Sequence, residues 1–209
     1  MTVSSDNQDR LYAGYARIAN RLGGLYTRFQ FDLLDPTEEA KADGQVQASF
    51  ASDPSFIAPL KYNKAVWLCY ADGAQLQPNN ILVGPYGTFY IADKQPFAPM
   101  QAIRCNCKIA IGRVSYSTVG PITGTVTNFA LNLPAFFQFT REDIQKPTSS
   151  FGAQLGRAIT HWDAFIPAAQ GTLKQDDIVV DQETGINYIL DAPNYTNAGY
   201  VVRLRLATV

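Results

Sequence analysis

The sequence is short of charged residues. Only 17% of its 209 residues are Asp, Glu, Lys or Arg, whereas about 25% is usual in a soluble domain. The net charge of −1 excludes nucleic-acid binding by bulk electrostatic attraction, because such binding needs a clear excess of Lys and Arg. Ser, Thr, Asn and Gln outnumber the charged residues. We therefore expect a surface that is polar but carries few charges, which fits a chain whose flanks are covered by other proteins.

The sequence also lacks long hydrophobic runs, and its cysteines are few. No apolar run approaches the roughly 18 residues of a membrane span, and the polar start MTVSSDNQDR has no basic segment followed by an apolar one. Three cysteines are an odd number, and Cys105 and Cys107 are too close for an unstrained bridge within one strand. We expect no membrane segment, no secretory signal, and synthesis in a reducing cytoplasm.

Residues for catalysis and metal binding are scarce as well. His161 is the one histidine, which removes most catalytic triads and most His-rich metal sites. No GxSxG, HExxH or phosphate-binding loop is present. Cys69, Cys105, Cys107 and His161 would make a Cys₃His set, but the CxC spacing is unlike that of zinc knuckles. We predict no catalytic residue, no cofactor and no metal, hence a protein that is not an enzyme.

One helix is predicted, near the N-terminus. From residue 6 to residue 22 the apolar residues recur at the spacing of one side of an α-helix. The residues of this stripe are Leu11, Tyr15, Ile18, Ala19 and Leu22. Residues 4–6 (Ser-Ser-Asp) offer N-caps, and the glycine pair at 23–24 offers a left-handed stop.

Residues 35–64 follow no sustained period, although they include Phe50 and Phe56. A loop of this length without regular structure is uncommon in a compact domain and is usually functional, disordered or held by a partner. We therefore expect a long extended arm over residues 35–64, which orders in an assembly.

The remaining sequence is typical of β structure, since short runs rich in Val, Ile, Tyr and Phe alternate with turn residues. The runs are AVWLCY, ILVG, TFYIAD, IRCNCKIAIGRVSY, AFFQFT, DIVVD, NYILD and YVVRLRLATV. In the last run Val202 and Leu204 alternate with Arg203 and Arg205, as in a half-buried antiparallel strand. The predicted fold is mainly β, with one or two small antiparallel β-barrel or sandwich units, an N-terminal α-helix and the extended arm.

Two segments of the chain resemble each other. NNILV, Gly87 and FYIAD correspond to DDIVV, Gly185 and NYILD, with Trp67 and Trp162 upstream at nearly the same offset. With one residue inserted in the second turn, the two segments align end to end, and each is typical of a β-hairpin. We predict a helix at residues 1–25, a first β-unit at 26–118 and a second at 119–209, with the seam near Val119-Gly120-Pro121. Chance similarity between two short hairpins is the alternative.

The run NNILVGPYGTFYIADKQPFAPMQAIRCN, which follows LYAGYARIANRLGGLYTRF, resembles tailed-bacteriophage head–tail connector (neck) structural proteins. LKQDDIVVDQETGINYILD is similar to a hairpin of small β-barrel head-closure subunits. The resemblance implies a virion protein that forms a ring between portal and tail and encloses the DNA channel. Two β-units depart from the single-barrel head-closure pattern, so a closure, gateway or collar ring and a tail-terminator subunit all remain open.

The resemblance also implies the partners. We expect a homo-oligomeric ring, 12-fold or 6-fold, that contacts portal or adaptor proteins on one side and tail-terminator or collar proteins on the other. Double-stranded DNA would pass through without sequence-specific binding, and no membrane would be involved. The expected location is the virion neck, after synthesis in the host cytoplasm.

Several residues are candidates for interfaces with these partners, because they are charged residues on the helix and last strand or aromatic residues in the arm and a turn. They are Arg10, Arg17, Arg21, Phe50, Phe56, Tyr86, Arg203 and Arg205. The alternative function is a carbohydrate- or receptor-binding β-module of a tail fibre or baseplate, since exposed aromatic rings stack on sugars. Burial of both Trp67 and Trp162 would count against that alternative. An enzyme whose site is assembled from distant residues is a third possibility.

Overall fold

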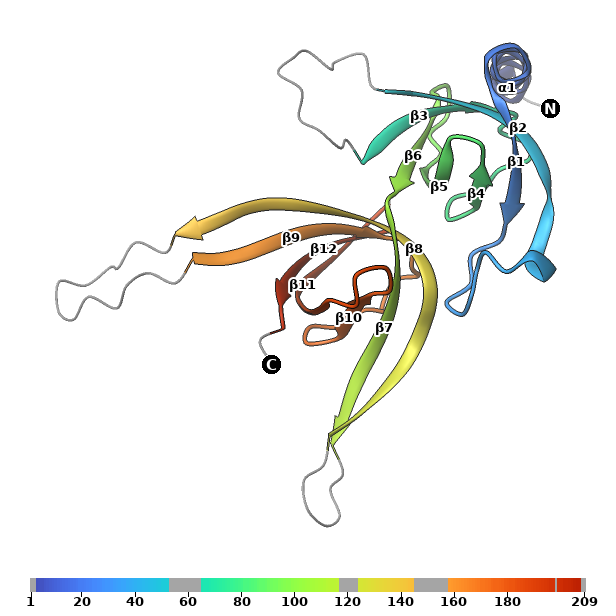
Figure 1. Ribbon diagram of the computed structural model, residues 1–209. Coiled ribbons are helices and arrows are strands. Elements are labelled where there is room, and N and C mark those ends of the chain that lie inside the picture. Colours follow the sequence, from blue (N-terminus) through green and yellow to red (C-terminus); the bar gives the residue numbers. More distant parts are fainter. Residues whose placement is uncertain (1–2, 53–64, 117–123, 145–157, 198, 208–209) are drawn as a thin grey trace.

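The computed structural model describes residues 3–52, 65–116, 124–144, 158–197 and 199–207. They form one helix and two closed β-barrels, which confirms the mainly β prediction (Figure 1). Helix α1 spans Val3–Leu22. The first barrel contains β1 (Gly24–Phe29), β2 (Ala42–Ser52), β3 (Val66–Ala71), β4 (Ile81–Gly84), β5 (Gly87–Asp93) and β6 (Met100–Cys105). The second contains β7 (Cys107–Tyr116), β8 (Gly124–Ile144), β9 (Ala158–Ile166), β10 (Ile178–Asp181), β11 (Asn187–Thr196) and β12 (Gly199–Leu206). No helix among the described residues is long and apolar enough to cross a membrane.

The two barrels have the same topology. Around the first barrel the strand order is β1-β2-β3-β6-β5-β4, and around the second it is β7-β8-β9-β12-β11-β10. All neighbouring strands are antiparallel, and pairing of β1 with β4 and of β7 with β10 closes the rings. Since every strand has its counterpart six places later in the chain, the repeated hairpins belong to two copies of one fold.

The hairpins that resemble each other in sequence, β4–β5 and β10–β11, occupy equivalent places. Asn79 and Asp176 both adopt positive φ, of 68° and 66°. The N–H of Asn79 donates to the carbonyl of Ile91 at 2.7 Å, and the N–H of Asp176 donates to that of Leu190 at 2.8 Å. Ile91 therefore corresponds to Leu190 rather than to Ile189. Two residues, not one, are inserted in the second turn, which moves the predicted alignment of the returning strand by one position.

The chain passes from one barrel to the other at Asn106, between β6 and β7. The predicted seam near residue 120 is therefore too late, because the run CKIAIGRVSY forms β7 of the second barrel. Asn106 fixes the crossing. Its side-chain NH₂ donates to the carbonyl of Phe137 at 2.9 Å, and its side-chain oxygen accepts the N–H of Phe137 at 2.8 Å. The side chain of Asn106 thus makes the pair of hydrogen bonds to β8 that the backbone of a strand residue would make.

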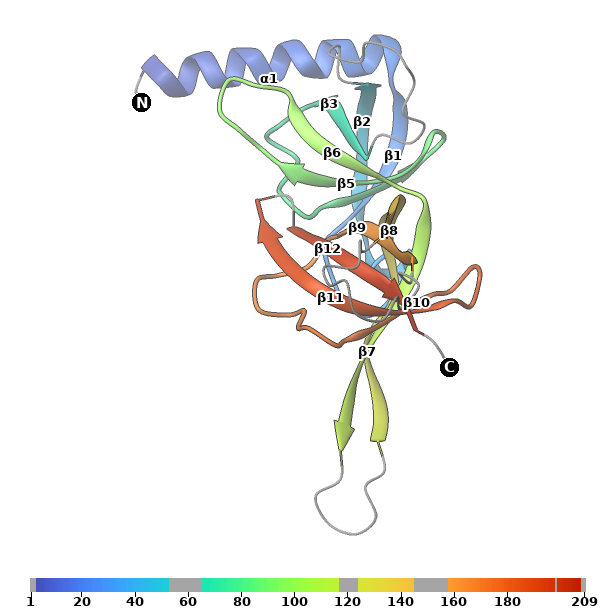
Figure 2. The same ribbon diagram turned by 90° about the vertical axis from the view of Figure 1, so that its left-hand side faces the viewer.

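The barrels are joined by a shared apolar cluster. Ile81, Tyr90 and Ile103 of the first barrel and Phe136 of the second are all buried in it. The rings of Phe136 and Phe165 meet edge to face, with centroids 6.1 Å apart. Because burial of apolar area stabilises at about 25 cal/mol per Å², this cluster holds the two barrels as one body (Figure 2).

The segment between β1 and β2 adds a second connection. Leu34 forms a parallel bridge with Leu131 of β8, and the N–H of Asp35 donates to the carbonyl of Leu131 at 3.0 Å. Phe31 and Leu33 pack against the core of the second barrel. The expected arm of residues 35–64 is corrected here, because residues 42–52 are strand β2 and hold a place between β1 and β3. Residues 53–64, including Phe56, lie outside the described residues.

Helix α1 begins at Val3, so the predicted N-caps lie inside its first turns. Its buried side is rotated from the predicted stripe. Ala19 is fully buried, and Tyr12 lies against Gly73, where an added Cβ would be 2.4 Å from the ring. Two residues of the predicted stripe, Ile18 and Leu22, are 37% and 75% exposed. Gly23 ends the helix through close approach to β2, not through positive φ, since a Cβ there would lie 2.3 Å from the carbonyl oxygen of Ala48.

A candidate interaction site at the first barrel

Each barrel carries a cluster of three aromatic residues at equivalent positions. In the first barrel Phe89 lies against Trp67 with ring centroids 6.2 Å apart and stacks on Phe50 at 3.7 Å. In the second barrel Tyr188 meets Trp162 at 5.2 Å and Phe137 at 5.6 Å. The pairing registers agree, since Trp67 lies opposite Ala102 and Trp162 opposite Leu204 on the corresponding strands. The tryptophans of the repeated sequence thus have one structural role, as the outer walls of the two aromatic clusters.

At the first barrel this cluster borders a pocket of 590 Å³. Phe50 and Trp67 form one wall, and Tyr86, in the β4–β5 turn, forms another. Phe89 is 2% exposed and Tyr86 is 65% exposed, so the pocket runs from the barrel core to the surface. The other lining residues are Leu22, Gly23, Ser49, Pro85, Gly87 and Arg104. We call these ten residues the aromatic pocket.

Arg104 supplies the one charge among the described residues of the aromatic pocket. Its guanidinium carbon lies 5.7 Å from the centroid of the Trp67 ring, a cation–π contact worth about 0.5–1 kcal/mol at an exposed site. Phe89 lies opposite Arg104, and Tyr188 lies opposite Leu206, so Leu206 takes the place of the arginine in the second barrel. The cation therefore distinguishes the first aromatic cluster from the second.

The described lining of the aromatic pocket is mostly apolar and aromatic. It contains no carboxylate and no histidine, and its polar side chains are Ser49, Tyr86, Arg104 and the Trp67 indole. Flat aromatic walls and one guanidinium suit an apolar or ring-shaped group that carries a negative or hydrogen-bond-accepting atom. A leucine or aromatic side chain beside a carboxylate has these properties, and so does a sugar ring.

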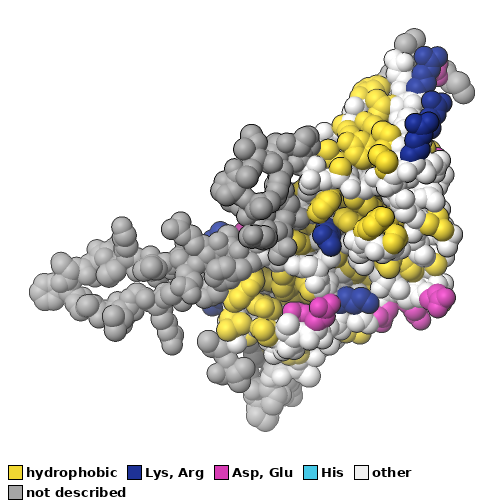
Figure 3. Space-filling view, turned by 45° about the horizontal axis from the view of Figure 1, so that its top comes forward, with side chains coloured by type: hydrophobic (Ala, Val, Ile, Leu, Met, Phe, Trp, Pro, Cys, Tyr) yellow, Lys and Arg dark blue, Asp and Glu magenta, His cyan; other side chains and the backbone are white. Residues whose placement is uncertain are grey.

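Leu22, the last residue of α1, lines the aromatic pocket and is 75% exposed. Ile18 of α1 and Leu25 of β1 are further exposed apolar residues. Figure 3 shows hydrophobic side chains to the left of the row of basic side chains at the upper right, and further hydrophobic side chains lower on the same face. Exposed apolar area gathered on one face marks interaction sites more often than single exposed residues do.

The predicted interface residues fall into separate groups. Phe50 and Tyr86 both line the aromatic pocket. Arg10, Arg17 and Arg21 are exposed along α1. Arg203 and Arg205 are exposed on β12 of the second barrel, where they lie 4.0 Å from Asp163 and 3.8 Å from Asp176. Phe56 lies outside the described residues.

Sequence reasoning did not identify Phe89, Arg104 or Leu22 as site residues. Leu22 belongs to the predicted apolar stripe of the helix, and the spacing alone does not mark it as a site residue. A signal for Arg104 did exist, since it interrupts an otherwise apolar strand next to buried Ile103. Trp67 is only half-buried, as is Trp162, so the condition that would have counted against a sugar-binding module is not met.

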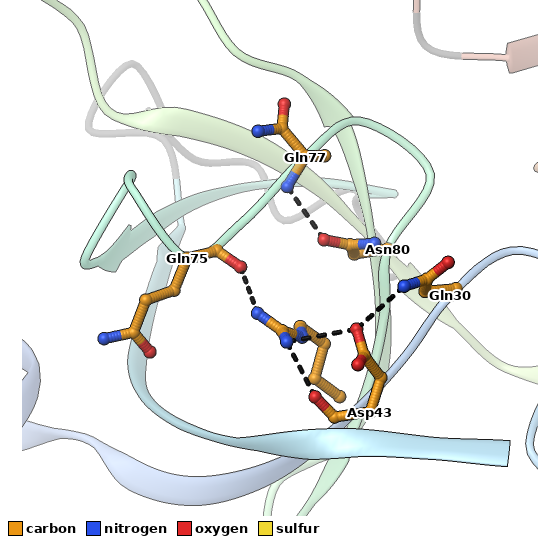
Figure 4. Close-up of polar contacts among 6 residues, drawn as sticks. Gln30, Asp43, Gln75, Gln77 and Asn80 are labelled. Carbon is orange, nitrogen blue, oxygen red and sulfur yellow. Dashed lines mark hydrogen bonds and ion pairs between the residues drawn. The ribbon is translucent and has the colours of Figure 1, made fainter.

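In each barrel an arginine of the first strand donates a hydrogen bond to the segment that precedes the repeated hairpin, β4–β5 or β10–β11. Arg28 donates to the carbonyl of Gln75 and, at 2.6 Å, to that of Asp43, whose carboxylate also accepts from Gln30 (Figure 4). In the second barrel Arg113 donates to the carbonyl of Thr172 at 3.0 Å. The buried Leu76 and Leu173 follow these carbonyls. The arginines therefore anchor the loops that start β4 and β10.

The second barrel adds a buried carboxylate to this arrangement. Asp177 is 1% exposed and accepts two hydrogen bonds of 2.7 Å from Arg113. These bonds raise the pKa of the Arg113 guanidinium. Asp177 also accepts the N–H of Lys174 at 2.7 Å, just as Asn80 accepts that of Gln77 at 2.8 Å in the first barrel (Figure 4). The turn bond is common to both barrels, but the ion pairs differ: Arg113 pairs with the turn residue Asp177, whereas Arg28 pairs with Asp43 of β2 at 3.0 Å.

The cysteines and the histidine do not come together in the described structure. Among the described residues there is no group of three His, Cys, Asp or Glu side chains that could hold a metal ion. Cys69 lies in the core of the first barrel, whereas His161 is on β9 of the second. Burial raises the pKa of Cys69 and of Cys107 to about 12 and also raises that of Cys105. These thiols therefore act as small apolar groups.

Comparison of the chain with protein-family models, with curated proteins and with solved structures finds no match.

Proposed function

We propose that this protein is a structural subunit of the head–tail neck of a tailed phage. It assembles into a ring between portal and tail, encloses the DNA channel, and catalyses no reaction. The observation that carries the proposal is the aromatic pocket, which is open to the surface beside the 75% exposed Leu22 of α1 and suits a protein neighbour. The sequence resemblance to neck proteins indicates that this neighbour is another protein of the neck.

The distribution of charge supports the same role. The net charge of −1 provides little counterion release, so DNA can slide through the channel without being held. The three arginines of α1 lie away from the helix's buried residues. They are available to an acidic neighbour or to passing phosphates.

The test is assembly of the purified protein. We expect negative-stain images and mass photometry to show a closed ring, alone or on portal–head complexes. Leu22→Gln and Tyr86→Ser should weaken assembly or docking at least about tenfold, as expected for anchor residues of an interface. Ile186→Ser is the matched control, because Ile186 is also exposed in a hairpin turn but lies in the second barrel. A strict monomer that also failed to bind portal–head complexes would contradict the proposal.

A second candidate function is favoured by the aromatic pocket itself. Trp67, Tyr86 and Arg104 could bind a sugar ring, as in a receptor-binding module of a tail fibre or baseplate. A glycan array followed by tryptophan-fluorescence titration tests this function. It requires Tyr86→Ala to abolish glycan binding while leaving any oligomer and its docking intact, whereas the neck function requires ring assembly or docking on portal–head complexes to fail.

A further inference from the structure

Strands β7 and β8 continue beyond the second barrel as a two-stranded ribbon. Pairing of β7 with β10 stops at Gly112, whereas its pairing with β8 continues to Tyr116 opposite Gly124. Pairing of β8 with β9 begins only at Phe136. In both views the ribbon projects away from the two barrels (Figures 1 and 2). Residues 113–116 and 124–128 therefore pair only with each other among the described strands.

Beyond Arg113 and the register shifts at its base, between Ile109 and Gly112, the ribbon carries none of the usual protections of an open edge. Ser115 and all residues from Gly124 to Asn128 are exposed. No Asp, Glu, Lys, Arg or His occurs in residues 114–140. Arg113, at the base of the ribbon, is bound to Asp177. Natural edge strands are usually shielded by charge, proline or a bulge, and an isolated two-stranded hairpin is marginally stable in water. An uncharged open ribbon is instead typical of strands that pair with another chain.

The absence of charge also indicates the partner. DNA phosphates and acidic or basic proteins would find no ion pair on the ribbon. A second copy of the same ribbon is uncharged as well, so two copies can meet without like-charge contacts. The two edges differ, since one belongs to β7 and the other to β8. Pairing of the β7 edge of one copy with the β8 edge of the next is head-to-tail, and such contacts close into rings when the rotation permits.

We propose that this ribbon, residues 113–116 with 124–128, pairs edge to edge with the same ribbon of neighbouring copies and so forms the contact between subunits. The inference rests on the proposed ring function and names the segment that makes the ring. The aromatic pocket, on the first barrel, is then free for a different protein of the neck.

The first test places charge on the ribbon. In the double variant Thr125→Lys with Thr127→Lys, every ribbon gains two positive charges, so neighbouring ribbons repel each other and association should weaken at least about tenfold. Gln45→Lys with Gln47→Lys is the matched control, because these two residues are also exposed, also lie two apart on a strand, and gain the same charge. Mass photometry and sedimentation at equal concentrations measure the change, and circular dichroism checks that both variants fold.

The second test locates the contact directly. The variants Ser115→Cys and Thr127→Cys are assembled separately and in an equal mixture, then oxidised. A covalent dimer that forms in the mixture far more than in either variant alone supports head-to-tail pairing. Dimers equally abundant in the separate variants would overturn head-to-tail pairing in favour of a two-fold contact.

The outcomes separate this inference from the proposed function. If a ring forms normally in the Thr125→Lys/Thr127→Lys variant and no mixed cross-link appears, the ribbon is not the subunit contact, while the neck function stands. If the wild-type protein is a monomer at every concentration, does not bind portal–head complexes and gives no cross-link, both are overturned.

Discussion

At the scale of single residues, two neighbouring aspartates illustrate how burial decides the value of an ion pair. Asp177 is almost fully buried beside Arg113, whereas Asp176 has a 71% exposed side chain and lies 3.8 Å from Arg205. A buried carboxylate that loses its partner keeps its desolvation cost, but an exposed one is simply hydrated. The same change in charge at the two arginines should therefore have very different effects.

We expect Arg113→Ala to lower the free energy of unfolding by about 3 kcal/mol, because it leaves Asp177 buried without a cation and removes the packing on Phe129. Arg205→Ala is the control and should cost less than about 1 kcal/mol. Urea titrations of the two variants measure the difference. Equal costs would mean that the Arg113–Asp177 pair contributes no more than a surface contact.

The buried thiols give a second prediction at this scale. With pKa values of about 12, Cys69 and Cys107 are thiolates in only about one molecule in 10⁴ at pH 8. Native protein should therefore react with a disulfide reagent far more slowly than protein unfolded in guanidinium. Rapid reaction of Cys69, the fully buried thiol, in the native protein would contradict this prediction.

The same pKa values predict a loss of stability in alkali. The folded-state pKa of Cys69 lies above the value of about 8.5 expected when unfolded, so the neutral thiol favours the folded state. This contribution is complete below about pH 8.5 and is lost as the pH rises toward 12. Cys69→Val should show a smaller fall in the urea midpoint between pH 8 and pH 10.5 than the wild type does.

At the scale of elements, the sequence predicted strands best where apolar residues are continuous or alternate cleanly. The runs that form β4, β5, β10 and β12 were all recognised. Strand β2 was missed because its sequence, ADGQVQASFAS, is mostly polar and small, with only Val46 and Ala48 buried. The pairing register also could not be predicted from the sequence. The alignment of β5 with β11 differs by one residue from the predicted one, because turn length and strand pairing decide it.

The helix shows why a candidate site is harder to predict than an element. The period placed the helix correctly, but it could not say which apolar residues face the barrel and which face a partner. Small Ala19 and polar-tipped Tyr12 take the buried side because β2 and the Gly73 loop approach closely there. The larger Ile18 and Leu22 are left exposed, and Leu22 lines the aromatic pocket.

Substitutions on the two sides of α1 should therefore behave differently. Ala19→Leu inserts a larger side chain at a fully buried position, and we expect a loss of about 1–3 kcal/mol in unfolding free energy. Leu22→Gln should change that free energy by less than about 0.5 kcal/mol, because the side chain is already exposed. Urea titration measures both values. A large loss of unfolding free energy in Leu22→Gln would show that the Leu22 side chain stabilises the fold, which would contradict its assignment to an interaction surface.

At the scale of the whole molecule, the shared cluster around Phe136 and the bridge between Leu34 and Leu131 imply that the barrels unfold together. Each barrel has its own reporter, Trp67 in the first and Trp162 in the second. Trp162→Phe leaves the first barrel fluorescent, and Trp67→Phe leaves the second. In each variant the fluorescence and circular-dichroism transitions in urea should coincide, which is the mark of one cooperative unit.

Phe136→Ala tests the cause of this cooperativity. The side chain is 3% exposed in the shared cluster, so its removal should cost about 3–5 kcal/mol and move the midpoints reported by both tryptophans together. Val126→Ala, on the exposed ribbon, is the control and should move neither. If Phe136→Ala lowered only the midpoint reported by Trp162, the barrels would be independent domains joined at Asn106. In the proposed neck ring, independent barrels would let each subunit bend at Asn106, whereas coupled barrels would make each subunit one rigid unit.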